Sequence, residues 1–326
     1  MRKRPLGRTG LQVSELGLGT WGISGDAYGE VTDAEADRVI DRAVQIGVTL
    51  FDTADVYGSA TNQLGAMERK LGRRLPLAST QVVTKIGTNV EGYPQKQFDA
   101  QFLFTAFERS EERLRRSPVD VVLLHNPSAA TLRKDEATGK MKDIVEQGRA
   151  RAWGVSAGNL EVARLAIDKG AQVLELAFNA FHARDVRALA TRLREEGVGL
   201  LARSVLQHGL LAGQWSAERE FWPGDHRAER WNPPELSRRI AQLAALRSAF
   251  SGPVQTVRAV ALRFVLEQER VSSAILGPRS VAQLDQLVRE SGRQPPYIQR
   301  GLLQVLEARL ASHGIELDEV DQVEGT

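Results

Sequence analysis

Short apolar runs alternate along the chain with longer stretches in which apolar residues recur every three or four positions. The short runs are almost continuously apolar, which is typical of strands that are covered on both faces, as in a parallel sheet. Eight such strands are predicted, at residues 15–19, 48–52, 81–85, 119–124, 152–155, 173–177, 198–202 and 272–276.

The stretches between these strands have the periodicity of helices with one buried face. Residues 33–46 carry an apolar stripe, and Asp33 is a candidate N-cap. Residues 101–115 and 184–197 behave similarly, and Gly197 is placed to end the second of them. Eight strands alternating with helices favour either a closed barrel or an open, doubly wound sheet.

Three segments depart from this alternation. Residues 4–14 carry turn residues between short extended pieces, which predicts a small hairpin covering one end of the sheet. Residues 207–236 are longer than an ordinary connection and hold several aromatic residues, which indicates a folded loop near a functional site. Residues 318–326 are predicted to form a frayed polar tail.

The overall composition excludes several classes of function. Lys and Arg total 43 and Asp and Glu total 41, so no basic footprint for nucleic acid is indicated. The chain has no cysteine, which excludes disulfides, thiolate catalysis and thiolate metal sites. No apolar run follows the basic N-terminus, and none reaches the ~18 residues of a membrane span. We expect a cytoplasmic protein of one domain, residues 1–326, that binds a small molecule and neither membrane nor metal.

Residues 17–22 (Gly-Leu-Gly-Thr-Trp-Gly) match the dinucleotide-binding fingerprint G-x-G-x-x-G. That fingerprint requires a helix that opens at once, with its N-terminus facing the pyrophosphate. Turn residues follow here instead, and the first helical pattern begins only near Asp33. We therefore interpret the match as a strand that ends in a tight turn, and not as a Rossmann fold.

Ionisable residues follow three consecutive predicted strands. Asp52 and Tyr57 come at and after the end of the second strand, Lys85 at the end of the third and His125 at the end of the fourth. In a (β/α)8 barrel, the carboxyl ends of the strands and the loops beyond them form the active-site face. The four side chains are thus predicted to meet at one rim.

These four groups suit proton transfer to a carbonyl oxygen. A phenol is a weak acid, and a neighbouring ammonium group is expected to lower its pKa. Tyr57 would then act as general acid, with Lys85 charged and aimed by Asp52, and with neutral His125 holding the carbonyl. Taken singly, each residue has a simpler interpretation as an ion pair, a packing group or a solvated charge. Their coincidence at successive strand ends favours catalysis.

Nearly the whole sequence resembles the aldo-keto reductase family. The resemblance implies a (β/α)8 TIM barrel with an N-terminal β-hairpin and an extra C-terminal helix, and it matches Asp52, Tyr57, Lys85 and His125 to the catalytic tetrad. It also implies NADPH/NADP+ as cofactor in preference to NADH, and a small carbonyl compound as substrate. The similar segments are residues 16–21, 51–58, 82–87, 123–127, 153–156, 209–213 and 275–280.

The resemblance also assigns residues to the cofactor and to the substrate. The cofactor set, besides Asp52, comprises Gly19, Thr20, Trp21, Ser156, Glu175, Arg203, Ser204, Leu206, Gln207, Gly209, Leu211, Gly277, Arg279 and Gln283. Arg203 would pack on the nicotinamide, and Arg279 would hold the 2′-phosphate of the adenosine. The substrate pocket would be lined by Trp21, Tyr57, His125 and Trp222.

Three positions depart from the family's pattern. Ala157 and Leu287 stand where many members have Asn, and Glu175 stands where a Gln usually binds the carboxamide. Glu175 accepts hydrogen bonds but, when ionised, donates none. Two functions of different class therefore stay open, a working reductase and a cofactor-binding accessory barrel with little turnover. The intact tetrad favours the first. The substrate and the oligomeric state are not predicted.

Overall fold

The structure is a computed structural model that describes residues 1–58, 64–90, 95–222, 225–252 and 254–317. Eight parallel strands close into a barrel with the order β10-β3-β4-β5-β6-β7-β8-β9. Each predicted strand overlaps one of them, and closure settles the choice between a barrel and an open sheet. The strands are β3 (Leu16–Gly19), β4 (Leu50–Asp52), β5 (Gln81–Ile86), β6 (Val119–His125), β7 (Ala150–Ser156), β8 (Val173–Ala177), β9 (Gly199–Arg203) and β10 (Val271–Leu276).

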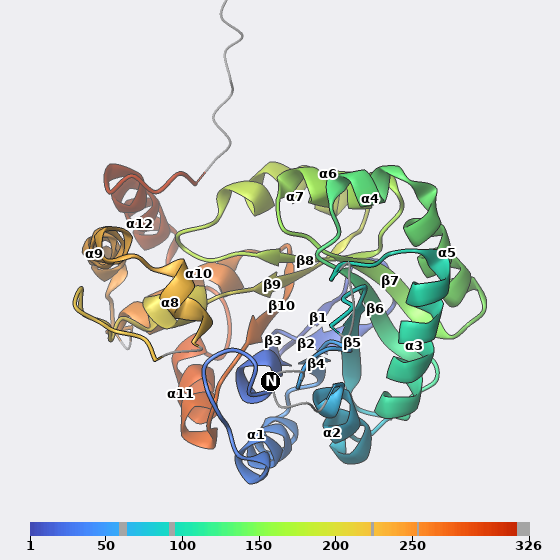
Figure 1. Cartoon of the computed structure of the whole chain (residues 1–326). Helices are drawn as coiled ribbons and strands as arrows, with labels where there is room; N and C mark the ends of the chain where they lie inside the picture. Colours follow the sequence, from blue (N-terminus) through green and yellow to red (C-terminus); the bar gives the residue numbers. More distant parts are fainter. Residues whose placement is uncertain (59–63, 91–94, 223–224, 253, 318–326) are drawn as a thin grey trace, which may run out of the picture.

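Helices surround the barrel and cover its outer face (Figure 1). Most of the buried apolar side chains lie between the strands and these helices, whereas a smaller apolar cluster fills the barrel itself. The helices are α1 (Asp33–Gln45), α2 (Ala66–Arg74), α3 (Ala100–Leu114), α4 (Ala129–Arg133), α5 (Asp135–Glu146), α6 (Leu160–Asp168), α7 (Arg184–Glu195), α8 (His226–Arg230), α9 (Pro233–Gln242), α10 (Val257–Glu267), α11 (Val281–Ser291) and α12 (Arg300–Ser312).

The ends of two helices show how local sequence sets their bounds. The N-cap of α1 is Thr32 and not Asp33 as predicted, because the Thr32 hydroxyl accepts a hydrogen bond from the Glu35 amide. Helix α7 ends before Gly197, whose positive φ of 62° is the left-handed conformation that glycine adopts without strain. Thr32 thus starts α1, and Gly197 leads the chain from α7 into β9.

The predicted hairpin is present and closes the N-terminal end of the barrel. Strands β1 (Lys3–Pro5) and β2 (Gln12–Ser14) pair antiparallel, and Leu6 and Val13 belong to the apolar cluster inside the barrel. Gly7 permits this close approach, because a side-chain carbon there would lie 2.3 Å from the Gly199 amide nitrogen. Access to the barrel interior is therefore confined to the opposite end.

The loop after β9 is folded, as its aromatic residues predicted. It contains the 3-10 helix η3 (Gln207–Ala212) and helix α8, and the rings of Trp215 and Phe221 lie 5.3 Å apart. Another 3-10 helix, η4 (Leu243–Ala249), follows α9 and packs against α12. Helices α8, α9 and α12 lie on the same side of the barrel (Figure 1). The predicted tail, residues 318–326, lies outside the described residues.

The segment with the glycine fingerprint has no Rossmann geometry. Strand β3 ends at Gly19 and is followed by a single 3-10 turn, η1 (Trp21–Ile23), and α1 begins only at Asp33. None of the helices within the described residues combines the length and the apolar character that a membrane span requires.

Candidate active site

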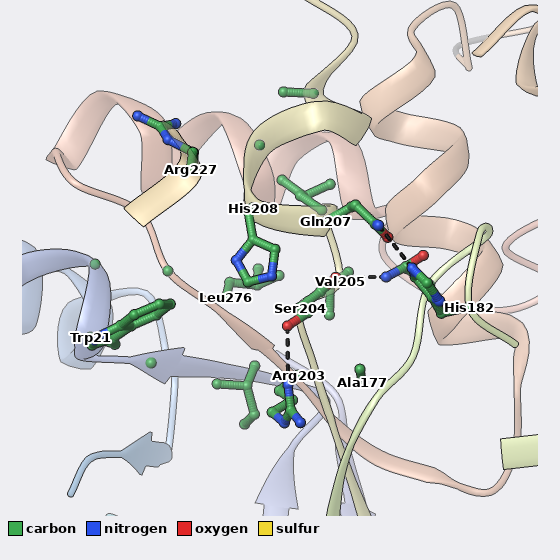
Figure 2. Close-up of a pocket in the computed structure, with 18 of the residues that line it drawn as sticks. Trp21, Ala177, His182, Arg203, Ser204, Val205, Gln207, His208, Arg227 and Leu276 are labelled. Atoms are coloured by element: carbon green, nitrogen blue, oxygen red, sulfur yellow. Dashed lines mark hydrogen bonds between the residues drawn. The ribbon is translucent and has the colours of Figure 1, made fainter. Parts of the chain in front are cut away.

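A cavity of about 1430 Å³ opens at the C-terminal end of the barrel. Ends of the barrel strands line its floor, and the loop after β9 forms one wall (Figure 2). All four predicted catalytic residues, Asp52, Tyr57, Lys85 and His125, line this cavity.

Lys85 lies at the centre of a buried cluster of charges. Its Nζ donates hydrogen bonds to Asp52 Oδ1 at 2.6 Å and to the Thr53 carbonyl oxygen at 3.0 Å. Lys85 is 1% exposed and Asp52 is 4% exposed. An isolated ammonium group would be very costly to bury, so these partners are what keep the charged lysine in the protein interior.

Glu175 adds a second carboxylate to the cluster. Its Oε2 lies 3.3 Å from Lys85 Nζ, and its Oε1 lies 3.8 Å from Arg203 Nε. Arg203 is held in turn by the Ala157 carbonyl oxygen, to which it donates at 3.1 Å. Asp52, Lys85, Glu175 and Arg203 thus form a row of alternating charges across the cavity floor.

Glu175 affects the protonation of Asp52. Burial raises the pKa of Asp52 to about 7, and the neighbouring negative charge of Glu175 adds to this effect. The attraction of Lys85 lowers the pKa of Asp52 but does not overcome those two causes. Burial by itself would lower the pKa of Lys85, whereas Asp52, Glu175 and Tyr57 together raise it above its usual value, so the lysine stays charged.

Tyr57 and His125 face one another beside Lys85. The Lys85 Nζ lies 5.4 Å from the centroid of the Tyr57 ring. The ring centroids of Tyr57 and His125 are 6.2 Å apart, with an interplanar angle of 82°. The loop after β4 brings Tyr57 back over the barrel, where its amide donates to the Ala54 carbonyl oxygen. A small polar group could therefore contact both rings.

The protonation of these two rings follows mainly from burial. Burial raises the pKa of Tyr57 above its usual value, and Lys85 is the largest effect that opposes the rise. The expected net lowering of the phenol's pKa is therefore not found, because desolvation of the phenolate outweighs the ammonium. Burial, Lys85, Lys96 and Arg203 lower the pKa of His125 well below its ordinary range. At neutral pH the site presents a phenol and a neutral imidazole.

Neighbouring strands place further polar groups beside the tetrad. His125 on β6 pairs in register with Ser156 on β7, and Ser156 pairs with Glu175 on β8. Twelve of the predicted cofactor residues other than Asp52 line the cavity: Gly19, Trp21, Ser156, Glu175, Arg203, Ser204, Leu206, Gln207, Gly209, Gly277, Arg279 and Gln283.

Three predicted residues do not line it. Thr20 is fully buried, and its amide and hydroxyl both donate to the Asp52 carbonyl oxygen, at 2.9 and 3.0 Å. Leu211 is buried in the apolar core. Trp222, predicted for the substrate pocket, is 84% exposed and absent from the cavity wall. The aromatic composition of its loop gave no information on which rings would turn inward.

The start of α11 provides the other end of the cavity. Arg279 Nη2 donates to the carbonyl oxygens of Gly29 and Glu30, at 3.1 and 3.0 Å, while its amide donates to Gln283 Oε1 at 2.8 Å. Its buried Nε has no hydrogen-bond partner. Leu287, on the same helix, also lines the cavity.

An aromatic cluster that the sequence did not reveal connects the two walls of the cavity. The rings of Trp21 and Tyr28 lie 4.8 Å from that of His226, and the Tyr28 hydroxyl lies 3.4 Å from His208 Nδ1. Figure 2 shows His208 between Trp21 and Gln207 at the mouth. These contacts join residues some 180 positions apart, so no local pattern could have identified them.

Known proteins are similar to this chain over most of its length. A family model described as the aldo/keto reductase family matches residues 15–293. L-galactose dehydrogenase from Arabidopsis thaliana is 27% identical over 87% of this chain and 86% of its own length. A probable aldo-keto reductase from Glycine max is 27% identical over 86% of this chain and 82% of its own length.

Two solved structures share the fold. A glycerol dehydrogenase from Gluconobacter oxydans superposes with a TM-score of 0.82 at 24% identity. An aldo-keto reductase from Bacillus halodurans, in its holo form, does so with a TM-score of 0.78 at 20% identity. In both comparisons 99% of each chain is covered.

Proposed function

The chain belongs to the aldo/keto reductase family, a family of oxidoreductases that act on carbonyl compounds and alcohols, and on this premise we propose that it reduces aldehydes or ketones with NADPH in a reversible reaction. The observation that carries this proposal is the buried cluster on the cavity floor. There Lys85 lies 2.6 Å from Asp52 and beneath the ring of Tyr57, with His125 facing that ring.

The cavity residues fit a dinucleotide. Three of the buried polar atoms that lack a hydrogen-bond partner belong to its wall: Glu175 Oε2, Gln207 Oε1 and Arg279 Nε. Glu175 Oε2 is an acceptor on the cavity floor and Arg279 Nε is a cationic donor at the far end, which suits a carboxamide at one end and a phosphate at the other. Bound NADPH would supply the hydride. Ser156, Glu175 and Arg203 would hold its nicotinamide, and Arg279 and Gln283 its 2′-phosphate.

Tyr57 is the proposed general acid. Its raised pKa keeps the proton on the phenol at neutral pH, which is the state required to protonate the oxygen of a carbonyl undergoing reduction. Neutral His125 would donate a hydrogen bond to the same oxygen and hold it beside the phenol. Lys85 would stabilise the phenolate that forms, because an ammonium group close to the ring lowers the free energy of the anion.

Asp52 is proposed to orient this lysine. Its Oδ1 fixes Nζ beneath the Tyr57 ring, and its backbone carbonyl accepts from Thr20, which directly follows the neighbouring strand β3. The reverse reaction, oxidation of an alcohol, requires the phenolate of Tyr57 as base. Since burial opposes that phenolate, we expect alcohol oxidation to increase with pH.

The substrate is open within a broad class. Two of the proteins named above are an L-galactose dehydrogenase and a glycerol dehydrogenase, so polyhydroxylated compounds belong in any test. The neutral groups at the mouth, Trp21, Tyr28 and His208, are compatible with sugars and with aromatic aldehydes alike.

The proposal is tested by NADPH oxidation with 4-nitrobenzaldehyde and methylglyoxal, and by NADP+ reduction with L-galactose and glycerol. We expect turnover of one or more of these substrates, and a loss of about 10³-fold in kcat/KM for Tyr57→Phe. The control is Tyr297→Phe, which removes a phenol at the closed end of the barrel. Cofactor binding without turnover, or an active Tyr57→Phe protein, would instead favour an accessory barrel.

A further inference from the structure

Glu175 is a buried carboxylate that faces the cavity with one oxygen unsatisfied. The side chain is 2% exposed, and Oε2 makes no hydrogen bond. Lys85 Nζ lies 3.3 Å from that oxygen in an ion pair, but its two hydrogen bonds in the cluster go to Asp52 and Thr53, so Oε2 can still accept one from a ligand. An acceptor left unsatisfied in a buried position is costly, and a ligand that supplies a donor would remove this cost.

The charge on Glu175 is only partly balanced within the cluster. Asp52 forms the shorter contact to Lys85, at 2.6 Å, and Arg203 approaches Glu175 no closer than 3.8 Å. Removing the negative charge of Glu175 therefore makes the net charge of the cavity floor more positive by one unit. Buried charges interact strongly because little water screens them.

The interaction of a nicotinamide ring with such a charge depends on the redox state of the ring. It is positively charged when oxidised and neutral when reduced, while the rest of the dinucleotide is unchanged. A nearby carboxylate therefore stabilises the oxidised ring selectively, whereas an amide of the same shape stabilises both forms to a similar extent.

We infer that Glu175 makes this cavity bind oxidised nicotinamide dinucleotide in preference to the reduced form, because it places a carboxylate beside the ring. The family's pattern has an amide at this position. The inference rests on the proposed function, because it requires the nicotinamide to lie between Glu175 and Tyr57. Through linkage, the same carboxylate shifts the equilibrium of bound reactants towards the alcohol and the oxidised cofactor.

The experiment measures dissociation constants for NADP+ and NADPH by isothermal titration calorimetry, with no substrate present. Glu175→Gln should weaken NADP+ binding about tenfold relative to NADPH binding. Glu316→Gln is the matched control, because it removes one negative charge from the outer part of the same cavity, where Glu316 pairs with Arg184 at 3.1 Å. It should leave the ratio of the two constants within about twofold.

Two further variants distinguish an effect of charge from a loss of folding. Glu175→Asp keeps the charge and should preserve most of the preference, whereas Arg203→Gln removes a positive charge and should shift the ratio towards NADP+. An unchanged ratio in Glu175→Gln, or equal shifts in Glu175→Gln and Glu175→Asp, would overturn the inference. Failure of the wild-type protein to bind either form would instead overturn the proposed function.

Discussion

The two ends of the barrel each bury a cation against a carboxylate, but in different surroundings. At the closed end, Arg4 lies 3.4 Å from Glu15 and donates to the carbonyl oxygens of Leu266, Gln268 and Val271. Glu15 in turn accepts from the Tyr297 hydroxyl at 2.6 Å. At the open end, Lys85 and its two carboxylates border a cavity.

This difference separates stability from function. The partners of Arg4 are mostly backbone carbonyls, which fix the hairpin, β10 and the segment after α10 relative to one another. The partners of Lys85 are side chains that can change protonation or contact a ligand. Burial is similar at both ends, so it is the availability of an unfilled neighbouring space that distinguishes a reactive cluster from a structural one.

Substituting the cation at each end should give opposite results. Lys85→Met should lower kcat/KM by about 10³-fold, because the phenolate of Tyr57 loses its stabilising charge. Its free energy of unfolding should fall by only about 1 kcal/mol, because Asp52, whose pKa is already raised to about 7, can take up a proton, and Arg203 remains beside Glu175. Arg4→Met should keep kcat/KM within about twofold but lower the free energy of unfolding by about 3 kcal/mol, because Glu15 and three carbonyls lose a buried donor.

Both variants are compared by urea unfolding and by initial rates at a temperature well below either midpoint. If folded Arg4→Met lost as much kcat/KM as Lys85→Met, the closed end would also contribute to activity, and the distinction between a structural and a reactive cluster would be wrong.

The comparison also shows what the sequence could predict. Asp52, Lys85 and His125 were identifiable because each ends a strand, and parallel strands deliver their ends to one rim by construction. The backbone carbonyls that the side chains of Arg4 and Arg279 contact were not, because they lie more than 240 residues away along the chain. The net effect on the pKa of Tyr57 was also missed, since it depends on how fully the loop after β4 is buried, which no spacing of residues reveals.

The open end should make stability depend on pH in a specific window. The folded-state pKa of Asp52, about 7, lies above its unfolded value of about 3.9, so the folded protein binds the proton more tightly. This contribution to stability is present below about pH 4 and is lost as the pH rises through 7. Asp52→Asn removes this pH dependence, so the stability of the variant relative to wild type should rise by about 3 kcal/mol from pH 5 to pH 8.

Thermal or urea unfolding of both proteins across this range measures the effect. His125 has the opposite sign, because its lowered pKa favours the folded state above about pH 6.5, but it is present in both proteins and cancels in the difference. A constant difference between Asp52→Asn and wild type at all pH values would mean that Asp52 does not titrate in this window.

The smallest expected effect concerns the far end of the open cavity, where Arg279 bridges the start of α11 and the loop before α1. Two of its donors are already used by the Gly29 and Glu30 carbonyls. A phosphate would therefore interact with the remaining donors and with the positive charge. Arg279→Gln should weaken NADPH binding about tenfold, or about 1.4 kcal/mol, while NADH binding changes by less than about twofold because NADH lacks the 2′-phosphate. Fluorescence titration with both dinucleotides measures this difference. Equal losses for the two would show that Arg279 acts by holding the loop in place, as Arg4 holds the hairpin at the closed end, and not by contacting the phosphate.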